Sequence, residues 1–389
     1  MIFLLAFGLS LLVAVAVSER ARRTVLSTSV LFLLVGLVLG PGAAGVLDLQ
    51  TSTDAVSIFI ELALIVVLLS DGAHLHVRQV LDSWRLPLRA LGIGLPVTLA
   101  LTGLAAWLLT GLPLLHALLL GAVLSPTDPV LAEAIVGREE VPFRLRRFLN
   151  VESGLNDGLA LPFVLLLLAA VRDDSAHPFR IALELAVGAA VGVAVPLAGT
   201  WLLGWRHLGV AERYEALALP ALGTVALATA GVLHGNLFLT AFLCGITMRT
   251  VAPELVDASD ELAEALSEVV KLAALLAFGV LFSASLFSSF VVAEWVLVLV
   301  VLFAVRPVAL FVAMLGRSVD WQLFAAAAWF GPKGFASVTF ALLALERDHP
   351  FGDLVFHLAG LVVTASIVAH SSTDALVARK LAVELGDGD

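Results

Sequence analysis

Long runs of apolar residues recur from one end of this 389-residue chain to the other, separated by short breaks rich in charge, proline or glycine. A helix needs about 20 apolar residues to cross the hydrocarbon core of a bilayer. The runs therefore predict an all-α polytopic membrane protein with thirteen spans, over residues 2–18, 24–40, 54–76, 86–110, 113–136, 145–171, 180–205, 214–233, 236–251, 262–286, 290–316, 321–345 and 353–372.

The composition excludes several other classes of protein. The chain is 60% hydrophobic and 14% charged, whereas a soluble domain is about 45–50% apolar and about 25% charged. A soluble enzyme or a disordered protein of this composition is therefore excluded. The net charge of −10 argues against a nucleic-acid partner.

The placement of basic residues predicts the orientation of the spans, because cytoplasmic loops of membrane proteins are enriched in Lys and Arg. With the N-terminus outside, sixteen of the 22 Lys and Arg residues fall in inner loops and three in outer loops. The remaining three, Lys271, Arg306 and Lys333, lie within spans. We therefore expect a multi-pass protein of the prokaryotic plasma membrane, surrounded by lipid, with residues 373–389 as a short cytoplasmic tail.

The loops are short and carry no soluble regulatory domain, so the function is expected inside the bilayer. Neither a phosphate-binding loop nor a dinucleotide fingerprint is present in the sequence. We expect no cofactor, no resident metal and no enzymatic activity.

Two spans carry helix-breaking residues together with a charge near mid-depth. The first break reads Ser-Pro-Thr-Asp-Pro at 125–129, and the second reads Gly-Pro-Lys-Gly at 331–334. The breaks lie seven spans apart, so the two spans run in opposite directions, as inverted repeats of a transporter require. Half-helix ends carry opposite partial charges, so we expect Asp128 to balance N-termini and Lys333 to balance C-termini.

The sixth span carries the densest polar set, Glu152, Ser153, Asn156 and Asp157, on one broad helical face. A carboxylate at this depth costs at least about 2.5–3.5 kcal/mol. We interpret Glu152 with Lys333 as a structural ion pair. Asp157 suits a small monovalent cation, which it binds in competition with a proton.

Oxygen atoms for such a cation are available from residues near Asp157. The unwound segment at Thr127 offers a hydroxyl and free carbonyl oxygens, and Ser153 offers a second hydroxyl. One site that takes either ligand, opened to each side in turn, is a complete exchange mechanism.

These motifs resemble those of the monovalent cation–proton antiporters, and more narrowly the sodium/proton exchanger branch that carries an Asn-Asp pair. The string Ser-Pro-Thr-Asp-Pro-Val at 125–130 and the string Glu-Ser-Gly-Leu-Asn-Asp-Gly at 152–158 are the specific elements. The segment 36–41 and the Gly-Asn pair at 235–236 are weaker similarities.

The resemblance implies an antiporter fold of thirteen helices with two crossed discontinuous helices, a homodimer and a role in pH homeostasis. It implies a core domain over 86–171 and 290–372, and a dimerisation domain over 1–85 and 180–286. It also implies that Asp157 and Asn156 bind the transported ion, with oxygens from Ser153 and Thr127. Asp71 would face the ion pathway.

One departure leaves the stoichiometry open. The Asn-Asp branch usually has Arg where this chain has Lys333, and a buried lysine can lose its proton whereas Arg stays charged. The sequence favours electroneutral exchange of Na⁺, or of K⁺ or Li⁺, for H⁺. A K⁺/H⁺ antiporter and electrogenic exchange through Lys333 remain alternatives, as do a cation channel and a sodium-coupled solute symporter.

Overall fold

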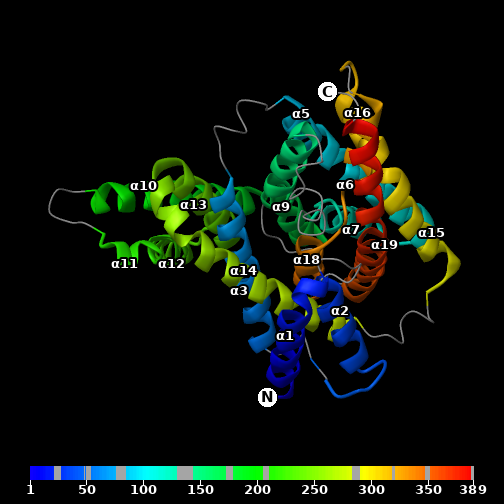
Figure 1. Ribbon diagram of the computed structural model, residues 1–389, viewed down its shortest axis with the longest axis horizontal. Helices are drawn as coiled ribbons and strands as arrows, with labels where there is room; N and C mark the ends of the chain where they lie inside the picture. The colour runs from blue at the N-terminus through cyan, green and yellow to red at the C-terminus, as the bar shows by residue number, and fades with distance from the viewer. Residues whose placement is uncertain are drawn as a thin grey trace.

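The chain folds almost entirely into helices, as the ribbon in Figure 1 shows. The computed structural model describes residues 1–21, 28–47, 49, 54–75, 85–128, 143–171, 178–204, 210–282, 290–317, 320–346 and 351–386, and these contain no β-strand. Five helical stretches of this part are long and apolar enough to cross a membrane: Leu86–Thr110, Gly154–Val171, Phe179–Leu203, Val292–Met314 and Gly352–His370. Six more helices are apolar but shorter.

One set of helices comes from residues 1–75 and 178–281. Its members are α1 (Ile2–Ala21), α2 (Thr28–Leu39), α3 (Asp54–His74), α10 (Pro178–Leu203), α11 (Glu212–Glu215), α12 (Ala218–Val232), α13 (Leu237–Val251) and α14 (Pro253–Leu281). Helix α13 packs on both α3 and α10, and α14 packs on α2. In Figure 1, α10 to α13 project to the left, and α3 and α14 lie between them and the other helices.

A second set forms the bundle on the right of Figure 1. Its first half contains α5 (Arg85–Arg89), η1 (Ala90–Gly94), α6 (Leu95–Thr110), α7 (Leu114–Val123) and α9 (Phe143–Val171). Its second half contains α15 (Val292–Val300), η4 (Val301–Val305), α16 (Arg306–Met314), α17 (Trp321–Trp329), α18 (Phe335–Glu346) and α19 (Gly352–Gly386). The halves interlock, because α6 contacts α15 and α7 contacts both α18 and α19.

The two halves of the bundle repeat the same order of features. Each begins with a helix that contains a π-helical turn, η1 or η4, and a proline two residues after that turn, Pro96 or Pro307. Each continues with a helix that stops inside the bundle and ends with a long helix, α9 or α19. This order matches the predicted inverted repeat.

The predicted spans agree with the described helices except at some boundaries. Helix α14 begins at Pro253 rather than at residue 262, because its first turns are polar and hydropathy marks only its apolar remainder. Proline suits this first helical position, where no backbone hydrogen bond is lost. Helix α19 continues through the predicted tail to Gly386. Residues 129–142, which the fifth predicted span enters, lie outside the described part.

Glycines allow some of these helices to pack with their backbones in contact. A Cβ atom added at Gly72 of α3 would overlap the backbone of α13 at Phe242, and one at Gly245 of α13 would overlap the backbone of α3. Small residues serve this purpose between helices in membranes. The α3–α13 contact fixes the position of Asp71, which is adjacent to Gly72.

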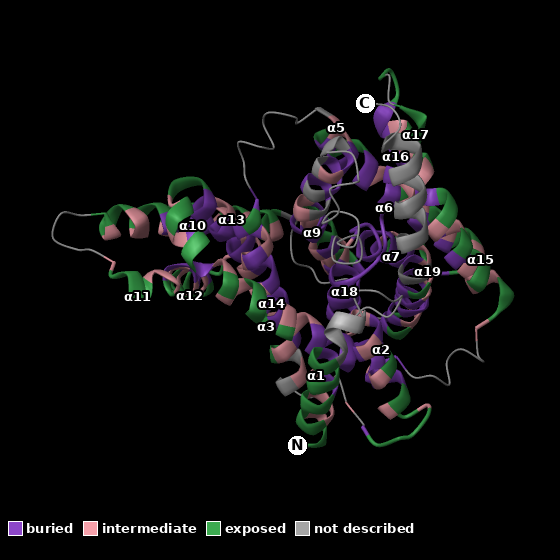
Figure 2. Ribbon diagram, in the orientation of Figure 1, coloured by how far each residue is buried: buried purple, intermediate pink, exposed green. Residues whose placement is uncertain are grey.

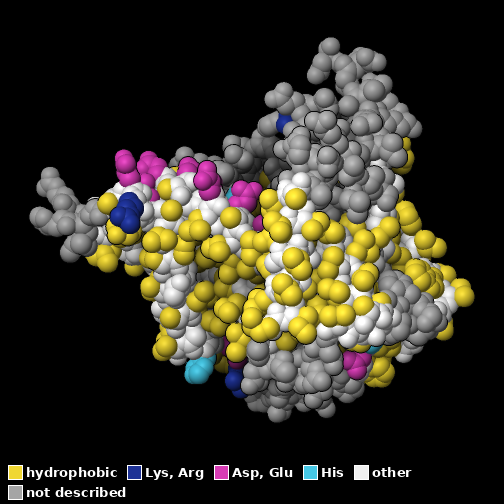
Figure 3. Space-filling view, turned by 60° about the horizontal axis from the view of Figure 1, so that its bottom comes forward, with side chains coloured by type: hydrophobic (Ala, Val, Ile, Leu, Met, Phe, Trp, Pro, Cys, Tyr) yellow, Lys and Arg dark blue, Asp and Glu magenta, His cyan; other side chains and the backbone are white. Residues whose placement is uncertain are grey.

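Burial follows the arrangement expected in a bilayer. The buried residues gather in the centre of the bundle and between α3, α13 and α14, whereas α1, α10 and α12 present exposed side chains (Figure 2). Many of the exposed side chains are large and apolar, among them Leu12, Trp107 and Trp201. On the face in Figure 3, hydrophobic side chains form a broad area, and the charged side chains lie toward its edges. Such a surface suits contact with lipid.

Candidate ion-binding site

The two interrupted helices meet in the middle of the bundle. After α7 the chain is non-helical through Asp128, and residues 330–334 between α17 and α18 are also non-helical. The two breaks are joined directly, because the backbone nitrogen of Asp128 donates to the carbonyl oxygen of Pro332 over 2.9 Å. Each break therefore satisfies a backbone group that the other leaves free, as the membrane interior requires.

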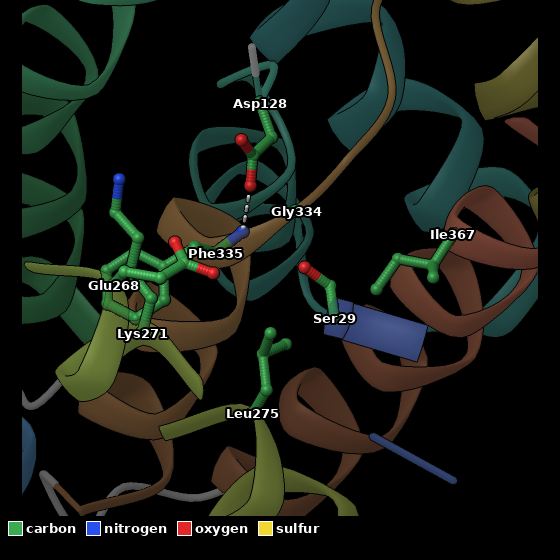
Figure 4. Close-up of a pocket in the computed structure, with 8 residues that line it drawn as sticks. All are labelled: Ser29, Asp128, Glu268, Lys271, Leu275, Gly334, Phe335 and Ile367. Carbon is green, nitrogen blue, oxygen red and sulfur yellow. Dashed lines mark hydrogen bonds between the residues drawn. The ribbon is translucent and has the colours of Figure 1, made fainter. Parts of the chain in front are cut away.

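The charges at the breaks lie beside opposite ends of the half-helices. The Asp128 carboxylate accepts from the backbone nitrogen of Phe335, the first residue of α18, over 2.7 Å (Figure 4). The Lys333 ammonium donates to the carbonyl oxygens of Ser125 and Pro126 at 3.4 and 3.2 Å. An anion thus faces a helix N-terminus, and a cation faces the carbonyl groups that follow α7, the favourable sense for each.

Asn156 of α9 is fixed by the first break. Its amide nitrogen donates to the Thr127 carbonyl oxygen at 3.0 Å and to the Thr127 hydroxyl at 2.6 Å. The amide oxygen of Asn156 is buried and has no hydrogen-bond partner among the described residues. Because a buried polar atom without a partner is costly, this oxygen is available to a ligand.

Asp157, the next residue along α9, is also buried, with 8% of its surface exposed. Its Oδ1 atom likewise lacks a hydrogen-bond partner within the described part of the chain. Its charge interacts with those of Asp71, Asp128 and Lys271. The neighbouring Gly158 packs against the ring of Phe242 on α13, so this part of α9 faces the other set of helices.

The remaining predicted ligand, Ser153, belongs to α9, but its side chain lies outside the described part of the structure. Of the predicted ligands, the structure therefore brings Asn156 into contact with Thr127 at the first break, and Asp157 follows Asn156 on α9.

The predicted ion pair between Glu152 and Lys333 is wrong. Both carboxylate oxygens of Glu152 accept from the guanidinium of Arg306 on α16, each over 2.9 Å. Arg306 also donates to the carbonyl oxygens of Ala327 and Phe330. The planar guanidinium satisfies a carboxylate and the end of α17 at once, which an ammonium cannot do.

Asp71 lies near the end of α3 and is paired with Lys271 of α14, with 3.7 Å between Oδ1 and Nζ. Both side chains are largely buried. The two residues come from helices of the first set, yet their charges interact with Asp128 and Asp157 of the bundle.

Sequence reasoning gave Arg306 and Lys271 no place in the site. One sequence feature could have identified them: each is a charged residue inside an apolar span. A buried charge requires a partner, and each of these residues has one. The sequence does not show which acid each one meets.

Comparison with known proteins agrees with this architecture. The transmembrane sodium/hydrogen exchanger family matches residues 8–379. The K(+)/H(+) antiporter NhaP2 of Shewanella baltica is 25% identical over 98% of this chain and 67% of its own length. The probable Na(+)/H(+) antiporter C3A11.09 of Schizosaccharomyces pombe is 35% identical over 36% of this chain and 20% of its own.

The fold is also that of a solved antiporter. The sodium proton antiporter MjNhaP1 of Methanocaldococcus jannaschii superimposes with a TM-score of 0.80 at 19% identity, over 98% of this chain and 99% of that one. The predicted polytopic all-α antiporter fold is thereby confirmed. Since the family match spans nearly the whole chain, this protein is an integral multi-pass membrane protein of the sodium/hydrogen exchanger family, whose members are cation–proton antiporters rather than enzymes.

Proposed function

We propose that this protein exchanges Na⁺ for H⁺ at Asp157. The observation that carries the proposal is that two successive residues of α9 each keep a buried oxygen without a hydrogen-bond partner among the described residues, Oδ1 of Asp157 and the amide oxygen of Asn156. Together with the Thr127 hydroxyl and carbonyl, which Asn156 contacts, they supply the oxygen ligands that a hard cation prefers.

Exchange follows from competition at one carboxyl group. Protonated Asp157 is neutral and holds no cation, whereas ionised Asp157 binds one. Either loaded form carries the site across as a neutral unit, and the empty ionised form does not cross cheaply because a bare charge is costly in the membrane. Acid therefore blocks the site with protons, and alkali deprives it of protons to exchange.

The stoichiometry proposed is one cation for one proton. Lys333 is held by the carbonyl groups of Ser125 and Pro126, and Glu152 is neutralised by Arg306. These contacts support structural roles for both side chains. Asp157 is then the group whose charge changes during the cycle, and exchange is electroneutral.

Potassium is the second candidate cation. Several relatives that align with 98% of this chain are named K(+)/H(+) antiporters, and an oxygen site of this kind accepts either ion.

At the level of the whole protein, we propose a plasma-membrane homodimer with its N-terminus outside. Residues 86–171 and 290–372 form the core that moves, and residues 1–85 and 180–286 form the dimerisation part. Asp128 balances the half-helix ends, and Asp71 faces the ion pathway.

The test is exchange by purified protein in proteoliposomes, measured with an internal pH dye against a panel of Na⁺, K⁺ and Li⁺. Asp157→Asn, which keeps the shape and removes the charge, is expected to abolish exchange while leaving the protein folded. Asp320→Asn is the matched control, because Asp320 caps the exposed start of α17 and an asparagine side chain can cap it equally. Retained exchange in Asp157→Asn contradicts the assignment.

Current and flux recorded together test the stoichiometry. No membrane potential is expected from a Na⁺ gradient. A potential generated by Na⁺-driven exchange would show that Lys333 or another group also releases a proton.

A further inference from the structure

Lys271 is a partly buried positive charge with no role in the exchange scheme above. It lies on α14, its side chain is 18% exposed, and its ammonium is 3.7 Å from Asp71. Its charge also interacts with Asp128, Asp157 and Glu268. The Lys271 ammonium is thus attracted by four carboxylates. One of them belongs to Asp157, the proposed ion ligand.

Lys271 lies where the first set of helices meets the crossing of the bundle. It lines a small cavity together with Glu268 of the same helix, Asp128 of the first break and Gly334 of the second break (Figure 4). Its ammonium lies 6.0 Å from the centre of the Phe335 ring, at the start of α18. The Lys271 side chain thus lines the same cavity as Asp128, the acidic residue of the first break.

The pair with Asp71 is loose enough to be exchanged. The separation of 3.7 Å exceeds the usual length of about 2.7–2.9 Å for a charge-assisted hydrogen bond. A lysine ammonium is a compact point charge on a flexible stem, so it can change partners among nearby carboxylates. Besides Asp71, the nearby acids Asp128, Asp157 and Glu268 are therefore alternative partners for the Lys271 ammonium.

We propose that Lys271 is a tethered competitor of the transported cation, which neutralises Asp71 and weakens cation binding at Asp157. The inference rests on the proposed function of Asp157. Its physical basis is that a resident monovalent cation and an arriving one repel each other and seek the same carboxylates. Lys271 thereby sets the cation concentration at which the exchanger is half-saturated.

The size of the effect follows from Coulomb's law. A unit charge about 10 Å away, at the effective dielectric constant of about 20 that suits charges in proteins, changes a cation's binding constant by roughly an order of magnitude. Lys271→Met keeps the apolar stem and removes the charge, so we expect the KM for Na⁺ to fall roughly three- to tenfold. Asp71→Asn leaves the ammonium without its neutralising partner, so its KM is expected to rise by a similar factor.

The double variant Asp71→Asn/Lys271→Met distinguishes this role from a purely structural ion pair. It removes one charge of each sign, so its KM is expected to return to within about twofold of the parent. A structural pair predicts lower thermal stability in both single variants and an unchanged KM. Lys271→Met with an unchanged or higher KM would overturn the proposal.

A charge-restoration experiment keeps the test independent of how the single variants fold. In Asp71→Asn/Lys271→Cys, built with Cys244→Ala because Cys244 is the chain's single cysteine, no partner charge of the pair is left behind. Aminoethyl methanethiosulfonate then adds an ammonium at position 271, and methyl methanethiosulfonate adds a neutral group. The KM is expected to rise with the first reagent alone, and equal values with both reagents would refute a charge effect.

Two controls complete the design. Arg180→Met removes an exposed cation that pairs with Glu184 at 3.1 Å, and its KM is expected to match the parent. Asp157→Asn in the same vesicles tests the underlying function separately. If Asp157→Asn still exchanges, the proposed site is wrong, whereas if only the Lys271 series fails to shift KM, the competitor role alone is wrong.

Discussion

At the scale of single residues, the site is organised by charges that satisfy one another in a medium that does not tolerate unpaired ones. Glu152 and Arg306 form a two-pronged pair with both side chains 8% exposed. Asp128 and Lys333 each face backbone groups at the crossing. Asp157, in contrast, has a buried oxygen without a hydrogen-bond partner in the described part of the protein. For this reason we propose that it binds the transported ion.

Arg306→Met is expected to destabilise the protein by about 3–5 kcal/mol, because it leaves the Glu152 carboxylate buried and unpaired. Adding Glu152→Gln should recover part of this loss. The recovery is incomplete, since the carbonyl oxygens of Ala327 and Phe330 still lack their donor. Thermal unfolding of the detergent-purified variants measures both effects.

The matched control for Arg306 is Arg180→Met. The Arg180–Glu184 pair is exposed, and such pairs contribute about 0–1 kcal/mol. If Arg306→Met unfolded at the same temperature as Arg180→Met, the buried pair would have no structural role.

At the scale of elements, hydropathy predicted the spans well. Each span must present apolar side chains to its surroundings and must form its backbone hydrogen bonds within its own helix. Proline and glycine marked both breaks for the same local reason. The pairing of Glu152 with Arg306 was not predictable, since these residues lie 154 positions apart and two other basic residues, Lys271 and Lys333, were available. The start of α14 was missed because a helix can extend beyond the apolar run that reveals it.

The close contact of the two breaks depends on the lack of a side chain at Gly334. A Cβ atom there would overlap the Asp128 carboxylate. Gly334→Ala is therefore expected to displace Asp128 from the Phe335 nitrogen and to reduce exchange at least tenfold. Initial exchange rates in proteoliposomes, at matched protein content, measure the loss.

Gly92→Ala serves as the control for Gly334, because position 92 lies in the π turn of the same bundle and has open space around it. Its exchange rate is expected to stay within about twofold of the parent. Equal rates in the two variants would mean that the Asp128–Phe335 contact is dispensable.

At the scale of the whole molecule, the alternating access that we propose would move the bundle relative to the first set of helices. The contact between them includes Gly158 of α9, one residue after Asp157, against the Phe242 ring of α13. If the site crosses the membrane with the bundle, this contact cannot persist through the cycle. A channel with a fixed pore would keep it.

A covalent link across that contact is therefore expected to stop exchange. We would introduce Gly158→Cys and Phe242→Cys in a Cys244→Ala background and join them with a short bis-methanethiosulfonate after reconstitution. Exchange should fall to the level of empty vesicles and return when dithiothreitol cleaves the link. Phe242→Cys alone and Gly158→Cys combined with Phe242→Ala, which makes room for the added Cβ atom, are treated identically and control for the mutations and for the reagent. If the linked protein kept transporting at the rate of the reduced one, the proposed relative movement at this contact would be wrong, and the site would have to reach both sides of the membrane without displacement of α9 from α13.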